Sequence, residues 1–344
     1  MLTKKLSVSA EHLDASVRLA AQILKNGGLV VIPTETVYGL AANALDEEAV
    51  KKIFIAKGRP QDNPLIVHAG DLDSVEELVR EMPSAARKCA EAFWPGPFTM
   101  VLKKSNIVPN SVCAGLDTVA VRIPKNDVTQ KLLRESRLML AAPSANISGS
   151  PSPTTFEHVL NDLDGKIDAV LMGERCSVGV ESTVVTFATN PPRLLRPGGI
   201  TAEQLKEFIP ELVIDNAIFS EPKKDAVVAS PGMKYKHYSP KAKIIMVEAD
   251  RESFENFVAE QRKSNPDIFA LCFDESFSKL KQPLICCGRA EDSSDYAARL
   301  FDALRELDLR GCKLCYAISP CKQGVGLAVY NRLLRAAAFE VISL

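Results

Sequence analysis

Leu29-Val-Val-Ile-Pro33 is a short apolar run, rich in β-branched residues, that lies between two stretches of helical periodicity. The stretch before it begins near Ser9 and ends at Asn26-Gly27-Gly28, where the glycines stop a helix. The stretch after it predicts a helix from about Asp46 through Ile55. This order of helix, buried strand and helix predicts an α/β fold.

Further apolar runs continue the alternation to about residue 208. We expect strands at 64–68, 98–103, 118–122, 138–142, 169–172, 182–187 and 193–196, and helices at 75–87, 128–134 and 202–208. Because strand–helix units are mixed with apparent hairpins, the sequence predicts a mixed sheet.

The last hundred residues alternate more regularly. Strands are expected at 243–248, 268–273, 284–287 and 314–318, and helices at 251–261, 292–307 and 326–338. This pattern predicts a small, mostly parallel, three-layer α/β domain of Rossmann-like type. Residues 230–240 are bracketed by prolines and have the composition of a linker. The predicted organisation is a domain at 1–210, a linker at 211–240 and a second domain at 241–344.

The overall charge is close to neutral. The chain has 344 residues, and 42 Lys and Arg residues against 43 Asp and Glu residues give a net charge of −1. This balance argues against a protein that coats nucleic acid by bulk charge, but it leaves a local basic groove open. We find neither a secretory signal nor a run of about 18 apolar residues, so a cytoplasmic protein away from membranes is expected.

The nine cysteines are irregularly spaced, which is typical of core residues in a reducing compartment. Cys312 and Cys315 have the spacing of a metal or redox pair, but no second pair accompanies them. We therefore expect ordinary core cysteines there and no metal site.

The segment Lys57-Gly-Arg-Pro-Gln-Asp-Asn-Pro-Leu65 joins two cations to an amide, with a glycine and prolines that fix the backbone. Lys57, Arg59 and Asn63 can converge, and a lysine with an arginine is a common pairing for phosphate or carboxylate. We expect an exposed loop whose cations are available to phosphate. The alternative is a solvated basic connection between a helix and a strand.

A second segment is Ala142-Pro-Ser-Ala-Asn-Ile-Ser-Gly-Ser-Pro-Ser-Pro-Thr-Thr155, which follows a predicted strand. Small hydroxyl and amide side chains beside Gly149 would let a phosphate approach backbone N–H groups. The segment is neither a P-loop nor a dinucleotide fingerprint, and the alternative is a simple Asn/Ser/Pro turn.

Four shorter polar segments, at 34–38, 118–124, 180–185 and 195–199, lie near predicted strand ends. Each could be a cap or an exposed strand residue, but their joint occurrence favours a common site. The sequence has only four histidines and neither a Gly-x-Ser-x-Gly nor a His-Glu-x-x-His motif.

Taken together and in this order, the segments resemble the Sua5/YrdC/YciO family in its longer, two-domain form. The matching runs are Pro33-Thr-Glu-Thr-Val-Tyr-Gly-Leu40, Lys57-Gly-Arg-Pro60, Asn63-Pro-Leu-Ile-Val-His68, Val121-Arg-Ile-Pro124, Pro143-Ser-Ala-Asn-Ile-Ser-Gly149, Ser182-Thr-Val-Val185 and Leu195-Arg-Pro-Gly-Gly199. They cover about residues 10–210, and the rest resembles the family's linker and C-terminal domain. The resemblance implies that the first domain is a twisted mixed sheet with a concave basic cavity.

The resemblance also implies an L-threonylcarbamoyladenylate synthase, a nucleotidyltransferase that condenses L-threonine, bicarbonate and ATP and releases pyrophosphate. Mg²⁺ is expected with the ATP, without a prosthetic group. The product would pass to the tRNA threonylcarbamoyl-transfer machinery, which forms N6-threonylcarbamoyladenosine; weak binding of tRNA itself is left open. Because a carbamate oxyanion is already a nucleophile, the reaction would need no catalytic serine, cysteine or activating histidine.

The same resemblance assigns residue roles by matching position. Lys57 and Arg59 would be the catalytic cations that screen carbamate from triphosphate. Threonine would contact Thr36, His68, Arg122, Ser144 and Ser182, and ATP would contact Arg59, Asn63, Thr118, Asn146, Thr154, Arg196 and Tyr238. Arg122 is suited to a bidentate grip on the α-carboxylate of threonine. Residues 230–240 would close over the cavity as a lid that brings Tyr238 to the nucleotide, and passive packing of the linker's rings is the alternative.

Two other functions compete with the synthase. One is an RNA-binding regulatory module without synthase activity, which the near-neutral charge disfavours. The other is a carbamoyltransferase that acts on carbamoyl phosphate, as in larger proteins with a related domain. Those proteins carry zinc-finger and transferase segments for which this chain has no room.

Overall fold

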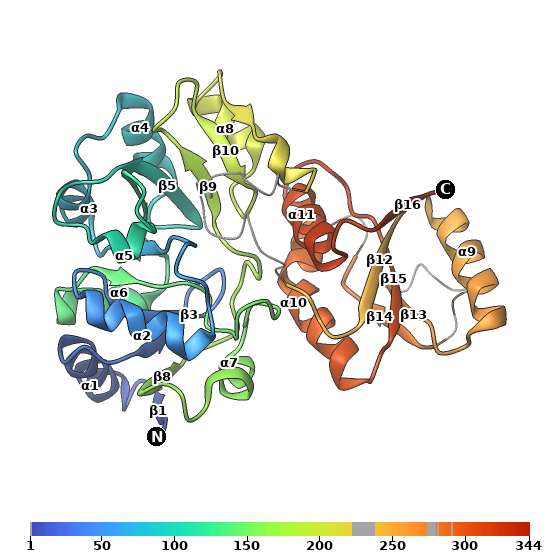
Figure 1. Cartoon of the computed structure of the whole chain (residues 1–344), viewed down its shortest axis with the longest axis horizontal. Coiled ribbons are helices and arrows are strands. Elements are labelled where there is room, and N and C mark those ends of the chain that lie inside the picture. The colour runs from blue at the N-terminus through green and yellow to red at the C-terminus, as the bar shows by residue number, and fades with distance from the viewer. Residues whose placement is uncertain (1, 222–237, 274–279, 281, 290–291) are drawn as a thin grey trace. The chain divides into compact units, whose positions relative to one another are not determined.

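The computed structural model describes residues 2–221, 238–273, 280, 282–289 and 292–344, which form two compact units (Figure 1). The first unit comprises residues 2–148 and 152–218. The second comprises residues 149–151 and 219–221 together with the described residues from 238 to the C-terminus. Each unit has its own sheet and its own buried core.

The first unit is built on a mixed sheet, as the sequence predicts. In spatial order its strands are β1 (Lys4–Ser7), β8 (Ala169–Met172), β2 (Val30–Ile32), β3 (Gly39–Asn43), β7 (Leu140–Ala141), β4 (Ile66–His68), β6 (Thr118–Arg122), β5 (Phe98–Lys103), β9 (Thr183–Thr186), β10 (Arg193–Arg196) and β11 (Val213–Ile214). The neighbours β4 and β6 are parallel, whereas β5 and β6 are antiparallel. Crossover connections and a strand reversal therefore occur in the same sheet.

Helices pack on this sheet and position the loops at its strand ends. They are α1 (Leu13–Lys25), α2 (Glu47–Lys57), α3 (Leu72–Leu78), α4 (Ser84–Phe93), α5 (Asn110–Cys113), α6 (Asp127–Ser136), α7 (Phe156–Leu163), α8 (Ala202–Phe208) and a 3₁₀ turn at Asn216–Ile218. The side chain of Asp46 caps the start of α2 by accepting from two backbone N–H groups. Gly58 ends the helix with φ at 60°, which favours glycine and fixes Lys57 in the last turn.

One prediction about secondary structure is wrong, and the strands β1, β3, β11 and β16 were not predicted. The helix expected at 75–87 is two helices, because α3 ends at Leu78 and α4 begins at Ser84. Val79 is extended and pairs with Lys104, and Pro83 lacks the N–H that a continuous helix would need. The strand β3 was not expected, because its Gly-Leu-Ala-Ala-Asn sequence has few of the branched or aromatic residues that favour strands.

The second unit confirms the predicted parallel α/β domain. Its strands, in the order β14 (Leu284–Cys286), β13 (Phe269–Cys272), β15 (Leu314–Ile318), β12 (Lys243–Glu248) and β16 (Val341–Ser343), are all paired in parallel. Helix α9 (Arg251–Ser264) lies on one side of this sheet, and α10 (Ser293–Leu309) and α11 (Gly326–Ala336) lie on the other (Figure 1). Phe254 and Val258 of α9 pack against Val247 of β12 in the core.

Across the described ranges no helix has the length and apolar character required to cross a bilayer. All nine cysteines are free thiols, and Cys312 and Cys315 are buried. Within the part of the chain that the structure describes, no group of three or more His, Cys, Asp or Glu side chains could hold a metal ion.

Candidate functional site

Three of the candidate site residues, His68, Arg122 and Thr118, lie at the ends of β4 and β6. In the parallel register, His68 pairs with Arg122 at one end, and Ile66 pairs with Ala120 nearer the other. Thr118 begins β6. Because β4 and β6 are parallel, Thr118 lies at the same end of these strands as the loop from Arg59 to Pro64. Four residues of strand separate Thr118 from Arg122, which is about 13 Å at 3.3 Å per residue. The predicted threonine contacts His68 and Arg122 are thus a strand length from the predicted ATP contact Thr118.

Arg122 lies at the centre of the first end. Its guanidinium is buried and donates from Nε to the carbonyl of Gly96 at 3.1 Å and from Nη1 to the hydroxyl of Thr36 at 2.9 Å. Its Nη2 lies 2.7 Å from Oε1 of Glu35 in a buried ion pair. Arg122 is therefore held in place by three neighbours from two separate segments, an arrangement that presents a fixed cation to a small anionic ligand.

The loop after β2 supplies two of these neighbours. The hydroxyl of Thr34 accepts from the backbone N–H groups of Thr36 and Val37 and lies 2.8 Å from the hydroxyl of Thr36. The backbone carbonyl of Glu35 accepts from Val178. This local turn directs the side chains of Glu35 and Thr36 to the same guanidinium.

Ser182 and Arg196 form a second buried pair at this end of the sheet. Arg196 donates from Nε to the carbonyl of Ser182 at 3.0 Å and from Nη2 to its hydroxyl at 3.1 Å. The same hydroxyl lies 2.8 Å from that of Thr99 on β5. Sequence matching assigns Arg196 to ATP and Ser182 to threonine, so two residues predicted for different ligands are in direct contact.

His68 is a neutral imidazole in this environment. Burial, with a further contribution from the charge of Arg122, lowers the pKa of His68 to about 3. Its Nδ1 is buried and has no hydrogen-bond partner among the described residues. An unpaired buried ring nitrogen is costly, and a bound ligand could supply the missing partner.

Lys57 differs from its prediction in one respect. We expected it on an exposed loop, and this is wrong, because it lies in the last turn of α2 with only 2% of its surface exposed. Its ammonium donates to the backbone carbonyls of Ser144 and Asn146. Burial, with a smaller effect of Arg59, lowers the pKa of Lys57 well below its usual value. The side chain of Lys57 therefore braces the Ser-Ala-Asn loop, on which the hydroxyl of Ser144 donates to the amide oxygen of Asn146 at 2.6 Å.

Arg59 and Asn63 lie on the loop that follows α2. Arg59 donates from Nη2 to the backbone carbonyls of Pro64 at 3.2 Å and Asn63 at 3.4 Å, so it closes its own loop. The amide oxygen of Asn63 is buried without a hydrogen-bond partner in the described ranges. Asn63 precedes β4 and His68 ends it. Each end of this strand therefore carries one buried polar atom without a hydrogen bond from the described residues.

The remaining predicted contacts lie elsewhere in the chain. Thr154 is buried before α7, and its backbone carbonyl accepts from Cys176. Tyr238 belongs to the second unit, where its ring centroid lies 5.2 Å from that of Phe301 and 5.9 Å from the guanidinium of Arg332. Residues 230–237 of the proposed lid lie outside the described residues, so the lid stays a prediction.

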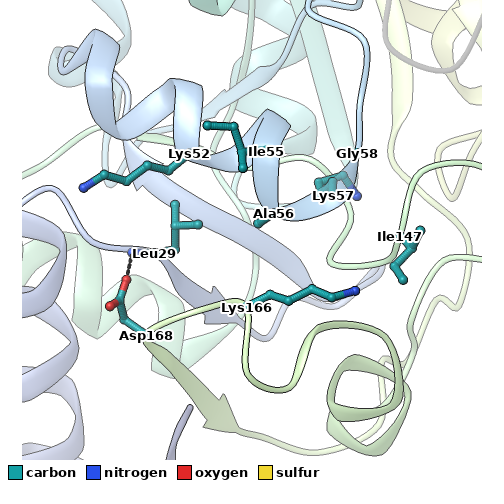
Figure 2. A pocket seen from close by; sticks show the side chains of 9 residues that line it. All are labelled: Leu29, Lys52, Ile55, Ala56, Lys57, Gly58, Ile147, Lys166 and Asp168. Atoms are coloured by element: carbon teal, nitrogen blue, oxygen red, sulfur yellow. Dashed lines mark hydrogen bonds between the residues drawn. The ribbon is translucent and has the colours of Figure 1, made fainter. Parts of the chain in front are cut away.

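A separate cavity of about 660 Å³ lies beside the C-terminal half of α2 (Figure 2). It is lined by Leu29, Lys52, Ile55, Ala56, Lys57, Gly58, Ile147, Lys166 and Asp168. Of the predicted site residues only Lys57 lines it, and the carboxylate of Asp168 is engaged with the N–H of Leu29 at 2.8 Å. The cavity therefore does not coincide with the polar groups at the strand ends.

Sequence reasoning missed two residues of the site. Glu35 lies in the polar segment at 34–38 but was assigned no role, although its carboxylate lies against Arg122. Thr99 was read as an ordinary strand residue, although its hydroxyl pairs with Ser182. The spacing of Thr34, Glu35 and Thr36 directly after a strand was a usable signal for Glu35, whereas nothing local distinguishes Thr99.

Comparisons with known proteins show which proteins this chain is similar to. The family model Sua5_yciO_yrdC, described as telomere recombination, matches residues 22–198, and the model Sua5_C, described as the C-terminal domain of threonylcarbamoyl-AMP synthase, matches residues 200–338. A threonylcarbamoyl-AMP synthase of Pyrococcus abyssi is 43% identical over 345 residues and covers 99% of each chain. One of Bacillus subtilis is 43% identical and covers 96% of this chain and 95% of its own. The crystal structure of P. abyssi Sua5 complexed with L-threonine superposes with a TM-score of 0.92, at 40% identity and full coverage of both chains.

Proposed function

This chain belongs to the Sua5/YciO/YrdC family, and we propose that it makes threonylcarbamoyl-AMP and pyrophosphate from L-threonine, bicarbonate and ATP. The observation that carries the proposal is the pair of polar groups at opposite ends of β4 and β6, one built around a fixed arginine and the other beside a cationic loop. The distance between them suits an amino acid and a nucleotide that meet in the middle. Full-length similarity to two synthases supports the same activity.

Threonine would bind at the end that carries Arg122. The guanidinium would donate two hydrogen bonds to the α-carboxylate, and the hydroxyl of Thr36, which accepts from Nη1, fixes the orientation of the guanidinium. The neutral ring of His68 can accept a hydrogen bond from the threonine hydroxyl, because Nδ1 has no partner among the described residues. Ser182 and Ser144 would complete the polar lining.

The nucleotide would bind along the loops at 57–64 and 142–155. Arg59, Lys57 and Arg196 carry the positive charge that lets a carbamate approach a triphosphate. The amide oxygen of Asn63 would accept a hydrogen bond from the base or the sugar. The other proposed nucleotide contacts are the hydroxyl of Thr118, the amide of Asn146 and Thr154. Tyr238, which the resemblance assigns to ATP, stays a proposed nucleotide contact.

The reaction then needs positioning more than activation. The carbamate oxygen attacks the α-phosphorus, the bond to the bridging oxygen breaks, and pyrophosphate leaves. Mg²⁺ would enter as part of the ATP complex and would lower the charge of the leaving group. Such ions are commonly bound by substrate phosphates with few protein ligands. The product would pass to the tRNA threonylcarbamoyl-transfer machinery, which also supports a cytoplasmic location.

Pyrophosphate release tests this proposal directly. The purified chain should release pyrophosphate only when threonine, bicarbonate and ATP are all present, and each omission should abolish the signal. Serine should be a poorer substrate, because the loss of one methyl group is worth about 1–3 kcal/mol in a fitted pocket. Alanine should be much poorer, because it leaves a buried acceptor unpaired. Equal rates with alanine and threonine would contradict the amino-acid assignment.

A further inference from the structure

Glu35 is a buried carboxylate that the proposed binding scheme leaves without a task. Only 8% of the residue is exposed, and its backbone is fixed by the hydrogen bond from Val178 and the turn around Thr34. Oε1 lies 2.7 Å from Nη2 of Arg122, yet neither carboxylate oxygen accepts a hydrogen bond of good geometry from the described residues. A buried carboxylate normally accepts several hydrogen bonds, so at least one donor is missing here.

The chemistry of the proposed reaction supplies such a donor. Threonine enters with its amine protonated, as an ammonium ion, and this form has no lone pair with which to attack carbon. Its reaction with bicarbonate forms an N–C bond, breaks a C–O bond, and yields a carbamate, one water molecule and one proton. A group in the site must take up that proton before the amine can attack.

Other titratable groups around Glu35 and Arg122 are poor candidates. The imidazole of His68 on β4 has a pKa lowered to about 3 by burial and by Arg122, so it binds a proton weakly. Cys176, on the segment after β8, has a pKa raised to about 12, chiefly by burial, so it stays a thiol with no negative charge to neutralise. Arg122 on β6 is always a cation. Arg175, beside Cys176, is a guanidinium like Arg122, whereas Glu35 is a carboxylate and neither of its oxygens accepts a hydrogen bond of good geometry from the described residues.

We propose that Glu35 binds the ammonium group of threonine and accepts its proton, which makes it the base of the carboxylation step. This inference rests on the proposed synthase function. The N–H bond of the ammonium breaks, the proton goes to a carboxylate oxygen of Glu35, and the electron pair left on nitrogen attacks the carbon of bicarbonate. Arg122 would hold the α-carboxylate of the same molecule, so the two residues together match both charges of an amino acid.

Protonation of Glu35 also removes a charge conflict. The new carbamate is an anion, and a carboxylate beside it would oppose its formation. A neutral carboxylic acid can instead donate a hydrogen bond to the carbamate. It also loses its charge attraction to Arg122, whose Nη2 then becomes available to the bound α-carboxylate.

The variant Glu35→Gln tests this role because glutamine keeps the shape but cannot take up a proton. At neutral pH its kcat/KM for threonine should be about 10²–10⁴-fold below that of the original protein. The deficit should shrink as pH rises, by up to tenfold per pH unit below the pKa of the threonine amine, because the free amine then needs no base. Glu35→Asp retains a carboxylate and should keep a pH profile parallel to that of the original protein.

Three outcomes are decisive. A folded Glu35→Gln variant with near-normal activity overturns the proposal, and so does a deficit that is the same at every pH, since that is the behaviour of a structural residue. If Glu35→Gln does not fold, Glu35→Asp must retain the original pH profile, and a steep rise with pH in that variant overturns the proposal. The exposed Glu48→Gln on α2 is the matched control and should behave as the original protein. Failure of the original protein to release pyrophosphate would instead contradict the proposed function.

Discussion

His68 is the residue whose protonation the fold suppresses most clearly. Its pKa of about 3 in the folded chain lies below the ordinary value of 6.5, because burial and Arg122 both disfavour the charged ring. Between these two values the unfolded chain binds a proton at this position and the folded chain does not. The contribution of His68 to the free energy of unfolding is therefore fully present above pH 6.5, and it is lost as the pH is lowered toward 3.

We expect His68→Gln to flatten this acid sensitivity. Between pH 6.5 and 4 the original protein should lose up to about 1.4 kcal/mol of unfolding free energy per pH unit from this residue, and the variant should lack that part of the slope. Urea titrations followed by the fluorescence of Trp94, the single tryptophan, report on the first unit. The exposed His12→Gln is the control, and an unchanged slope in His68→Gln would contradict the assignment.

Individual residues also mark where sequence reasoning stops. The types at positions 36, 122 and 182 predicted polar contacts, and the structure does bury these side chains at one end of the sheet. Lys57 was misjudged because its charge suggested exposure, whereas its partners are two backbone carbonyls 87 and 89 residues away. Backbone partners at that distance leave no mark in the local sequence.

At the scale of elements, the turn after β10 holds the site by close approach. A Cβ atom built at Gly198 would lie 2.3 Å from the backbone nitrogen of Thr183 and 2.5 Å from the carbonyl oxygen of Glu181. No side chain is available to move aside, so a larger residue must displace the backbone that carries Ser182. The glycine is therefore required by contact distance and not by an unusual φ.

Gly198→Ala should accordingly weaken both the fold and the site. We expect a loss of about 1–3 kcal/mol in unfolding free energy and a rise in KM for threonine of at least about tenfold, since Ser182 and Arg196 lose their register. Gly70→Ala is the matched control, because its nearest contact would be the Cβ of Leu133 at 3.4 Å. Thermal denaturation and pyrophosphate kinetics give the two readouts, and a normal KM in Gly198→Ala would show that the segment around Ser182 tolerates the shift.

The elements themselves were largely predictable because their signals are local. Helix α1 and strand β2 follow from apolar spacing and a glycine stop, and the regular alternation in the second unit gave its parallel sheet. The break between α3 and α4 was missed because the pairing of Val79 with Lys104 is a tertiary contact that overrides helical spacing. Strand β3 was missed for the related reason that its partners, and not its residues, make it a strand.

For the molecule as a whole, the order of strands in space could not be read from the chain. The site depends on β4 lying beside β6 and on β5 lying between β6 and β9, although β5 separates β4 from β6 along the chain and β6, β7 and β8 separate β5 from β9. That order brings Arg122, Thr99 and Ser182 to the same end of three neighbouring strands. The family resemblance grouped Arg122 with Ser182 as threonine contacts but gave no role to Thr99, and the spacing of the three residues along the sequence does not group them.

The net charge leads to a prediction about nucleic acid. With 42 basic and 43 acidic residues, the chain has no excess charge with which to release counterions from tRNA. We expect tRNA to bind no more tightly than ordinary non-specific contacts, with a Kd above about 1 μM at physiological salt, while pyrophosphate release proceeds without tRNA. Gel shifts at two salt concentrations, with a basic tRNA-binding protein as positive control, measure this. Tight binding with a steep salt dependence and no turnover of ATP would support the RNA-binding module instead, because such a module needs a concentrated phosphate-binding face and no reaction chemistry.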